Sequence, residues 1–130
     1  MSTAAVWQGS DAELLAELAA LETRLHATWA QMLSVIAEVD SRGTATAVGY
    51  TSTIDLVRAV GRVSRGEARA RIDAAADVLP TRGVGGAPVP PRLPATAAAV
   101  AEHAIGAAAV RVIRSVLARI PPGLGAETRR

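Results

Sequence analysis

Four arginines stand out as the side chains whose type and spacing could bind a ligand: Arg58, Arg62, Arg65 and Arg69. The guanidinium group presents a planar fork of donors that suits phosphate oxygens and guanine edges. Arg65 and Arg69 are four residues apart, so on a helix they would share one face, away from an apolar stripe that contains Ala68. The pattern predicts DNA contact through this segment. The alternative is a solvated arginine face on a packing helix, in a chain that has no lysine.

The elements that position these arginines have the layout of a helix-turn-helix. The sequence predicts a short helix over about 53–61, with an N-cap in Thr51–Thr53 and an end at Gly61. Ser64 and Glu67 have the spacing of a capping box, and the helix that they open has Ala68, Ile72, Ala75 and Leu79 as its buried stripe and ends before Pro80. In such a motif the second helix enters the major groove. The turn, Gly61-Arg62-Val63-Ser64, is one residue longer than the usual Gly-Val-Ser.

Other kinds of chemistry lack support. The chain has no cysteine, no asparagine and only two histidines, His26 and His103. Neither histidine belongs to a pattern typical of a catalytic triad, so we expect a boundary residue at His26 and a polar helix end at His103. Asp73 and Asp77 are one turn apart and are expected to be ordinary surface residues, because a metal needs more ligands. We therefore expect no catalytic residue, no metal site, no cofactor and no small-molecule substrate.

A long helix is predicted ahead of this segment. Ser10 and Glu13 form a capping box, and the helix should run to about Asp40 and stop at Gly43. Apolar residues recur along it every three or four positions, on one stripe: Leu14, Leu18, Leu21, Leu25, Trp29, Met32, Ile36 and Val39. After Leu25 the spacing drifts from a strict heptad, which favours the core face of a helical bundle. The alternative is a coiled-coil seam that joins two copies of the chain.

The remaining segments complete an all-α bundle of about five helices. Residues 44–50 are expected to be a loop, and 80–94, with five of the seven prolines, an extended surface loop or flexible connector. Helices are expected over 95–103, with Pro94 at the first position, and over about 107–120. We expect one domain over 10–120, with flexible termini at 1–9 and 121–130.

Charge is distributed unevenly. In residues 1–40 six acidic residues stand against Arg24, a net charge of −5, whereas in residues 41–130 13 arginines stand against six acidic residues, a net charge of +7. Such halves indicate either a nucleic-acid face or two surfaces that attract each other within the fold. No signal peptide and no run of about 18 apolar residues is present, so we expect a cytoplasmic protein without membrane contact.

Three blocks of sequence resemble the actinobacterial 13E12 repeat family, and within it the N-terminal region called the domain of unknown function 222. They are Ser64–Ile72, Pro90–Thr96 and the pair Ala104–Gly106 with Val110–Ile113, and their order and spacing match over about residues 10–124. The resemblance implies a protein associated with repeats and mobile DNA. Members commonly continue into an HNH endonuclease domain, which two histidines and no asparagine cannot supply here.

No catalytic or binding residue carries over from the family to this region. Members often have a glycine near position 103 and a histidine near position 109, whereas this chain has His103 and Ala109. From the residues and the resemblance together, we expect a non-catalytic helical module that contacts DNA. The alternatives are a protein–protein or self-association module that uses the 14–39 stripe, and an inactive truncated copy of a longer protein.

Overall fold

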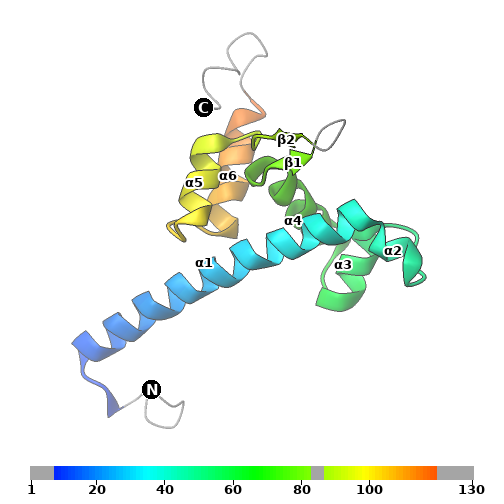
Figure 1. Ribbon diagram of the computed structural model, residues 1–130. Coiled ribbons are helices and arrows are strands. Elements are labelled where there is room, and N and C mark those ends of the chain that lie inside the picture. Colours follow the sequence, from blue (N-terminus) through cyan, green and yellow to red (C-terminus); the bar gives the residue numbers. More distant parts are fainter. Residues whose placement is uncertain (1–7, 83–86, 120–130) are drawn as a thin grey trace.

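The computed structural model describes residues 8–82 and 87–119, which form six helices and one short hairpin (Figure 1). The elements are α1 (Asp11–Arg42), α2 (Thr44–Ala47), α3 (Thr53–Gly61), α4 (Arg65–Val78), β1 (Thr81–Arg82), β2 (Pro88–Val89), α5 (Pro94–Ala101) and α6 (Ala107–Leu117). This architecture confirms the all-α fold with one long N-terminal helix. The termini expected to be flexible, 1–9 and 121–130, lie outside the described residues except for Gln8 and Gly9.

Helix α1 begins and ends where its capping residues predict. The Glu13 N–H donates to Ser10 Oγ and the Ser10 N–H donates to Glu13 Oε1, each over 3.2 Å. At the other end Gly43 takes a left-handed φ of 66°, which glycine adopts without steric cost. The 32 residues make a rod of about 48 Å at 1.5 Å per residue. No helix of the described residues, α1 included, is apolar enough over a sufficient length to cross a membrane.

Residues 44–50 are not purely a loop, as expected, because they contain the single helical turn α2. The Val48 N–H donates to the Thr44 carbonyl over 3.0 Å, and the Tyr50 N–H donates to the Ala45 carbonyl over 2.8 Å. Ala45 is only 3% exposed, and α2 contacts both α1 and α3. Tertiary packing therefore stabilises a turn whose alternating Thr and Ala residues have no helical period of apolar side chains.

The segment 80–94 also differs from the extended loop or flexible connector expected there. Strands β1 and β2 pair in antiparallel fashion, with Thr81 opposite Val89 and Arg82 opposite Pro88. Proline is tolerated in this pairing because a two-stranded ladder has only edge strands. Beyond the hairpin, the Leu93 N–H donates to the Asp77 carbonyl over 2.9 Å, which joins the returning chain to the end of α4.

Helices α5 and α6 are shorter than the expected 95–103 and 107–120. Pro94 is the first residue of α5, as predicted, but α5 ends at Ala101 and His103 has a left-handed φ of 61°. Helix α6 ends at Leu117, and residue 120 lies outside the described range. Since a left-handed residue cannot continue an α-helix, the backbone at His103 separates α5 from α6.

The core lies where α1, α4, α5 and α6 meet, and α4 is at its centre, in contact with α1, α3, α5 and α6. The buried cluster consists of aliphatic side chains from these four helices: Leu33, Ala74, Ala75, Val78, Val100 and Val110. Of the stripe expected on α4, Ala68 and Ala75 are buried, whereas Ile72 and Leu79 are half-buried. The small alanines of α4 let the other helices approach it closely, which compensates for the shortage of large aromatic residues.

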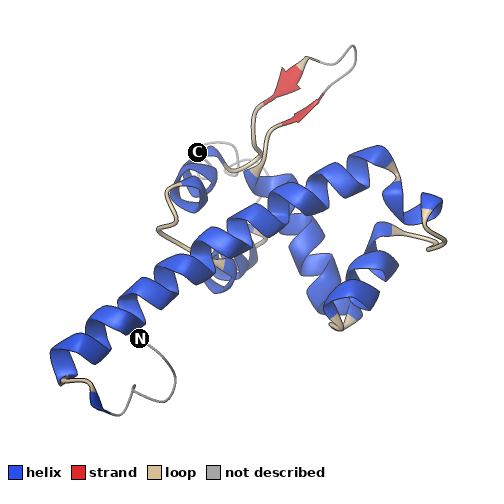
Figure 2. Cartoon of the chain, turned by 60° about the horizontal axis from the view of Figure 1, so that its bottom comes forward, coloured by secondary structure: helices blue, strands red, loops and turns tan. Residues whose placement is uncertain are grey.

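Only the second half of α1 belongs to this core. Its first turns project from the rest of the molecule, as Figures 1 and 2 show from two directions. Leu33 and Ile36 are buried, whereas Leu18, Leu21 and Leu25 are 57%, 43% and 63% exposed. The expectation that the whole stripe from Leu14 to Val39 is a core face is therefore wrong for its first half. The core helices pack alongside α1 only from about the level of His26, where the α5–α6 loop meets it.

Candidate nucleic-acid interface

The four predicted arginines lie on one corner of the molecule, formed by α3, a three-residue turn and α4. Serine caps open both helices. Ser52 Oγ accepts the Asp55 N–H over 3.2 Å at the start of α3, and Ser64 Oγ accepts the Glu67 N–H over 3.1 Å at the start of α4. Because each cap satisfies a backbone donor of the first helical turn, the two helices begin at defined residues. The helix-turn-helix layout predicted from the sequence is present.

Helix α3 ends at Gly61, as predicted, and the left-handed capping residue that follows is Arg62. Arg62 has a φ of 53° and its N–H donates to the Arg58 carbonyl, which ends α3. Gly61 is the last helical residue, and a Cβ there would lie 3.1 Å from Arg71 Nη1. A non-glycine residue therefore takes the left-handed position, and a Cβ at Gly61 would require only the end of the Arg71 side chain to shift.

The side chains of Arg58, Arg62, Arg65 and Arg69, here called the arginine corner, are all exposed. Arg65 Nη1 lies 3.5 Å from Asp55 Oδ1, and Arg58 follows Asp55 by three residues on α3, so both arginines lie near this carboxylate. Arg69 follows Arg65 by four residues and lies on the same open face of α4. Among the described residues, no acidic side chain lies within ion-pair distance of Arg58, Arg62 or Arg69.

Asp55 is the carboxylate within this cluster. The Thr51 hydroxyl donates to it over 2.6 Å, and this hydrogen bond, with further contributions from Ser52, Arg65 and Arg58, holds the pKa of Asp55 below its ordinary value. Asp55 Oδ1 lies 3.5 Å from Nη1 of Arg65, whose side chain is 63% exposed. An exposed pair of this kind is weak, because water and salt screen the two charges. Four arginines against Asp55 leave a net charge of +3.

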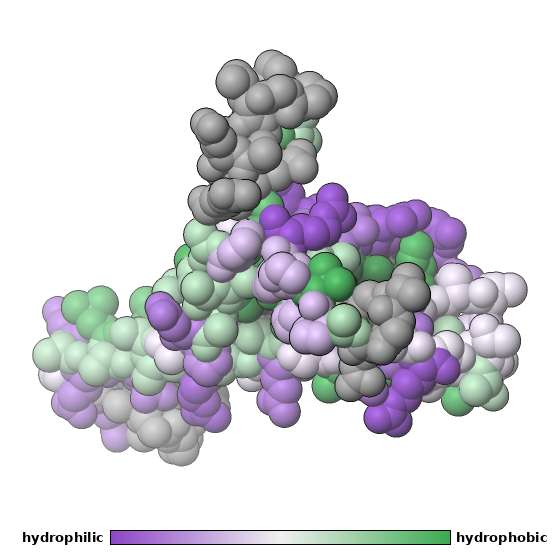
Figure 3. Space-filling view, turned by 45° about the horizontal axis from the view of Figure 1, so that its top comes forward, coloured by the Kyte–Doolittle hydropathy of each residue, from purple (hydrophilic) through white to green (hydrophobic). Residues whose placement is uncertain are grey.

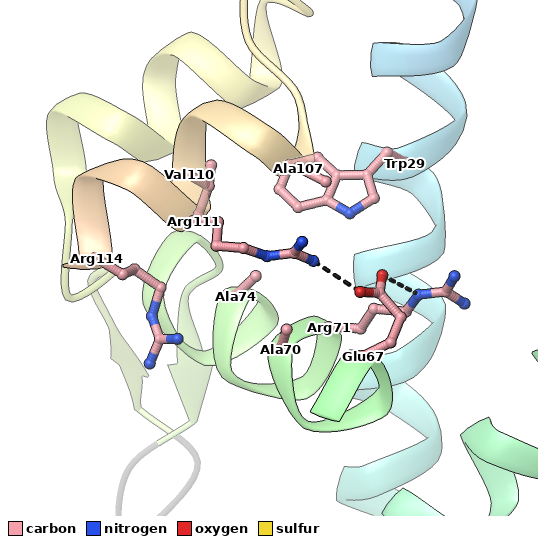
Figure 4. A pocket seen from close by; sticks show the side chains of 9 residues that line it. All are labelled: Trp29, Glu67, Ala70, Arg71, Ala74, Ala107, Val110, Arg111 and Arg114. Atoms are coloured by element: carbon pink, nitrogen blue, oxygen red, sulfur yellow. Dashed lines mark hydrogen bonds and ion pairs between the residues drawn. The ribbon is translucent and has the colours of Figure 1, made fainter. Parts of the chain in front are cut away.

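Glu67 points away from the arginine corner. Its carboxylate does not complete the expected capping box with Ser64, because it accepts hydrogen bonds from Arg71 Nε at 3.3 Å and from Arg111 Nη2 at 2.7 Å (Figure 4). Arg111 lies on α6, so this cluster joins α6 to α4. Figure 4 shows the cluster next to the indole of Trp29, in a pocket between α1, α4 and α6. Since the Glu67 carboxylate is engaged there, it does not neutralise the arginine corner.

A second ion-pair cluster corrects the expectation that Asp73 and Asp77 are ordinary surface residues. The Asp77 side chain is only 6% exposed, and it accepts a hydrogen bond from Arg114 Nε and lies 3.5 Å from Arg92 Nη1. Asp73 lies 3.6 Å from Arg114 Nη2. Arg114 is 37 residues from Asp77 in the chain, so local spacing on α4 could not reveal this pair.

The two histidines meet at the junction of α1 with the α5–α6 loop. His26 Nδ1 lies 3.1 Å from the His103 carbonyl oxygen, and His26 is half-buried, as a boundary residue should be. A Cβ at Gly106 would lie 2.6 Å from His26 Cδ2, so glycine is needed for the loop to reach α1. The contact is one of packing. Within residues 8–82 and 87–119, no group of three or more His, Asp or Glu side chains is placed to hold a metal ion.

A second surface lies on the projecting part of α1, in the stripe for which a coiled-coil seam was the alternative interpretation. Its Leu14 is half-buried and its next three leucines are exposed. We call Leu14, Leu18, Leu21 and Leu25 the leucine ridge, since they follow one another at spacings of four, three and four residues. Figure 3 shows hydrophobic surface gathered at this end of the helix. The available signal was the heptad spacing itself, which holds up to Leu25 and is lost where the stripe enters the core.

Comparisons with known proteins identify a family for this chain but no activity. The family model of DUF222, a domain of unknown function, matches residues 12–130. An uncharacterized protein of Mycobacterium tuberculosis strain H37Rv is 48% identical over 67 residues, which are 52% of this chain and 15% of that protein. Another uncharacterized protein of the same strain is 40% identical over 67 residues, with the same coverage of both chains. The match thus spans about 15% of the length of these relatives, and no solved structure matches.

Proposed function

Because the chain belongs to the DUF222 family, we propose that it is a non-catalytic helical module of a mobile-element-associated protein and that it contacts DNA through the arginine corner. The observation that carries this proposal is that three exposed arginines of one corner lack a carboxylate partner in the described structure. Arg71, Arg92, Arg111 and Arg114 each have a carboxylate partner in the described structure. Arg58, Arg62 and Arg69 have none there, and all three are exposed.

Exposed guanidinium groups on one corner suit the DNA backbone. DNA carries a negative charge about every 1.7 Å along its axis, and each phosphate neutralised by an arginine releases condensed counterions. This release favours binding without any need to read a sequence. The net charge of +3 on the corner therefore supports electrostatic association with a duplex.

The open face of α4 supports contact with a groove. The other sides of α4 pack against α1, α3, α5 and α6, and the residues that remain exposed on it are Arg65, Gly66, Arg69 and Ala76. Gly66 and Ala76 are small enough for a phosphate backbone to come close to the helix. In this arrangement Arg65 and Arg69 point into the groove, and Arg58 and Arg62 contact flanking phosphates, which set register but not sequence.

Fluorescence anisotropy with a labelled mixed-sequence duplex tests the proposal when it is repeated at several salt concentrations. We expect log affinity to fall linearly with log salt, with a slope of about −0.9 per phosphate contact. The variants Arg58→Ala and Arg62→Ala, which each remove a phosphate contact, should each reduce the magnitude of this slope by about one. Both side chains are exposed, so the fold should be retained.

Arg119→Ala provides the matched control. Arg119 is exposed beyond the end of α6, away from the arginine corner, and its loss changes the net charge of the chain by the same amount. The control should bind with the slope of the unmodified chain. Absence of binding at low salt, or an equal loss of slope in Arg119→Ala, would rule out the arginine corner as the DNA contact.

A further inference from the structure

The leucine ridge belongs to the same stripe of α1 that forms the core further along the helix. Trp29, Met32 and Ile36 of this stripe are buried or half-buried, but Leu18, Leu21 and Leu25 remain 43–63% exposed. Leu15, next to the ridge, is 67% exposed. A row of exposed leucines on a projecting helix is typical of an interaction surface. We propose that the leucine ridge is the interface of an antiparallel homodimer, in which it packs against the leucine ridge of a second copy of this chain.

The ridge is self-complementary in the antiparallel direction. Spacings of four, three and four residues place the leucines at alternating d and a positions of a heptad. When two such helices run antiparallel, Leu14 lies opposite the partner's Leu25 and Leu18 lies opposite the partner's Leu21. By symmetry the same two contacts form again with the copies exchanged. Every leucine of the ridge then meets a leucine of the partner.

The charges beside the ridge select this orientation. In the heptad that starts from Leu14 as d, Glu17 and Arg24 are g positions and Glu22 is an e position. Antiparallel helices bring g positions together, so Glu17 pairs with the partner's Arg24, twice in the dimer. Parallel helices would instead place Glu17 beside the partner's Glu22, again twice. These charged side chains therefore attract each other in the antiparallel arrangement and repel each other in the parallel one. The antiparallel arrangement also places the two helix dipoles in opposite directions, which is favourable.

The shape of the molecule leaves room for the second copy. In this register residue 28 of one copy lies level with residue 11 of the other, so the two cores lie at opposite ends of the paired segment. An open apolar groove lies at the base of the ridge, lined by Leu25, Trp29, Ile105 and Ala108 among others. The N-terminal end of the partner's α1, with its Leu14, would seat at this groove.

Sedimentation velocity over a range of protein concentration tests the proposal. The interface is small, so we expect a reversible monomer–dimer equilibrium with a dissociation constant of about 10 μM to 1 mM. The double variant Leu18→Asp/Leu25→Asp should be monomeric throughout, with the circular dichroism of the unmodified chain. Val60→Asp is the matched control, because Val60 is 78% exposed on α3, away from the ridge, and this variant should dimerise normally.

Charge reversal tests the orientation without changing any leucine. Glu17→Arg and Arg24→Glu should each weaken the dimer, by about tenfold, because each turns two attractive contacts into repulsive ones. The double variant Glu17→Arg/Arg24→Glu should restore the original affinity. These variants also keep the proposal testable if the aspartate variants fail to fold.

Three results would overturn the antiparallel dimer. A monomer at all concentrations would show that two copies do not meet at the ridge. The ridge would then be a surface for another segment of a longer chain. A stronger dimer in Glu17→Arg would show parallel helices. The third result concerns Leu18→Asp/Leu25→Asp at concentrations where the unmodified chain is monomeric. If this variant loses helical signal there, the ridge packs within its own chain. None of these results depends on DNA, so the proposed function and this dimer fail or hold separately.

Discussion

At the scale of single residues, two positions have a left-handed backbone conformation that is energetically unfavourable for a residue with a side chain. Among the described residues, Arg62 and His103 are the non-glycine residues with positive φ, at 53° and 61°. A side chain in this left-handed region costs about 1 kcal/mol, because Cβ crowds the neighbouring carbonyl oxygen. This cost gives a physical reason for the glycine that members of the resembling family often have near position 103. The loop between α5 and α6 requires a conformation that glycine adopts readily.

His103→Gly should therefore raise the free energy of unfolding by about 0.5–1 kcal/mol. The His103 carbonyl that contacts His26 is a backbone group, so it remains in the variant. Urea denaturation measures the change. Ala59→Gly, at an exposed position within α3, is the control and should lower the free energy of unfolding by about 1 kcal/mol. A loss of stability in His103→Gly would mean that its side chain contributes to the fold.

Asp55 makes stability depend on pH. Since the Thr51 hydrogen bond lowers the pKa of Asp55 in the folded state, the folded protein binds a proton at this site less readily than the unfolded chain does. The resulting stabilisation is complete above the ordinary pKa of 3.8 and is lost as pH falls through the lower folded-state value. Thr51→Val should make unfolding in urea less dependent on pH below about pH 4. An unchanged pH dependence would contradict this role of Thr51.

At the scale of elements, α4 is positioned by ion pairs as well as by apolar packing. Glu67 and Asp77, at its two ends, each bind an arginine of α6, namely Arg111 and Arg114. The two clusters differ in burial. The Glu67 side chain is 32% exposed, whereas that of Asp77 is 6% exposed. The same kind of pair should therefore contribute very differently to stability.

Arg114→Leu should lower the free energy of unfolding by about 3 kcal/mol, because it leaves Asp77 buried with only the more distant Arg92. Arg111→Leu, on the same helix, should cost about 1 kcal/mol or less, since Glu67 keeps Arg71 and some contact with water. Urea denaturation of both variants measures the two costs. Equal costs would show that the burial of Asp77 does not decide the strength of its pair.

At the scale of the whole molecule, the uneven charge of the chain is separated in space. The acidic first turns of α1 project from one end, and the arginine corner lies at the other, beside α2 and α3 (Figure 1). Within the described residues, no carboxylate of α1 pairs with an arginine beyond Arg42. The described residues therefore do not support one of the two interpretations of the charge pattern, in which the acidic and basic halves attract each other within the fold. Both surfaces remain available to other molecules.

The sequence by itself determined several helix boundaries, because these depend on residues that are neighbours along the chain. The Ser10–Glu13 capping box, the stop at Gly43, an N-cap for α3 within Thr51–Thr53, the Ser64 cap of α4 and the Pro94 start of α5 were all predicted. Each depends on hydrogen bonds or backbone preferences within about four residues. The arginines of the corner could also be picked out from composition and helical spacing.

The tertiary structure alone decided which of these side chains are paired or buried. Glu67 could have completed its own capping box, but Arg111 from α6 takes its carboxylate. Asp77 is buried because Arg114 and Arg92 come from distant segments, and the stripe of α1 is split at about Trp29 because the other helices cover only its second half. These outcomes depend on contacts between residues far apart in the chain. Helical periodicity shows which face is apolar, but only the packed helices determine how much of that face is covered.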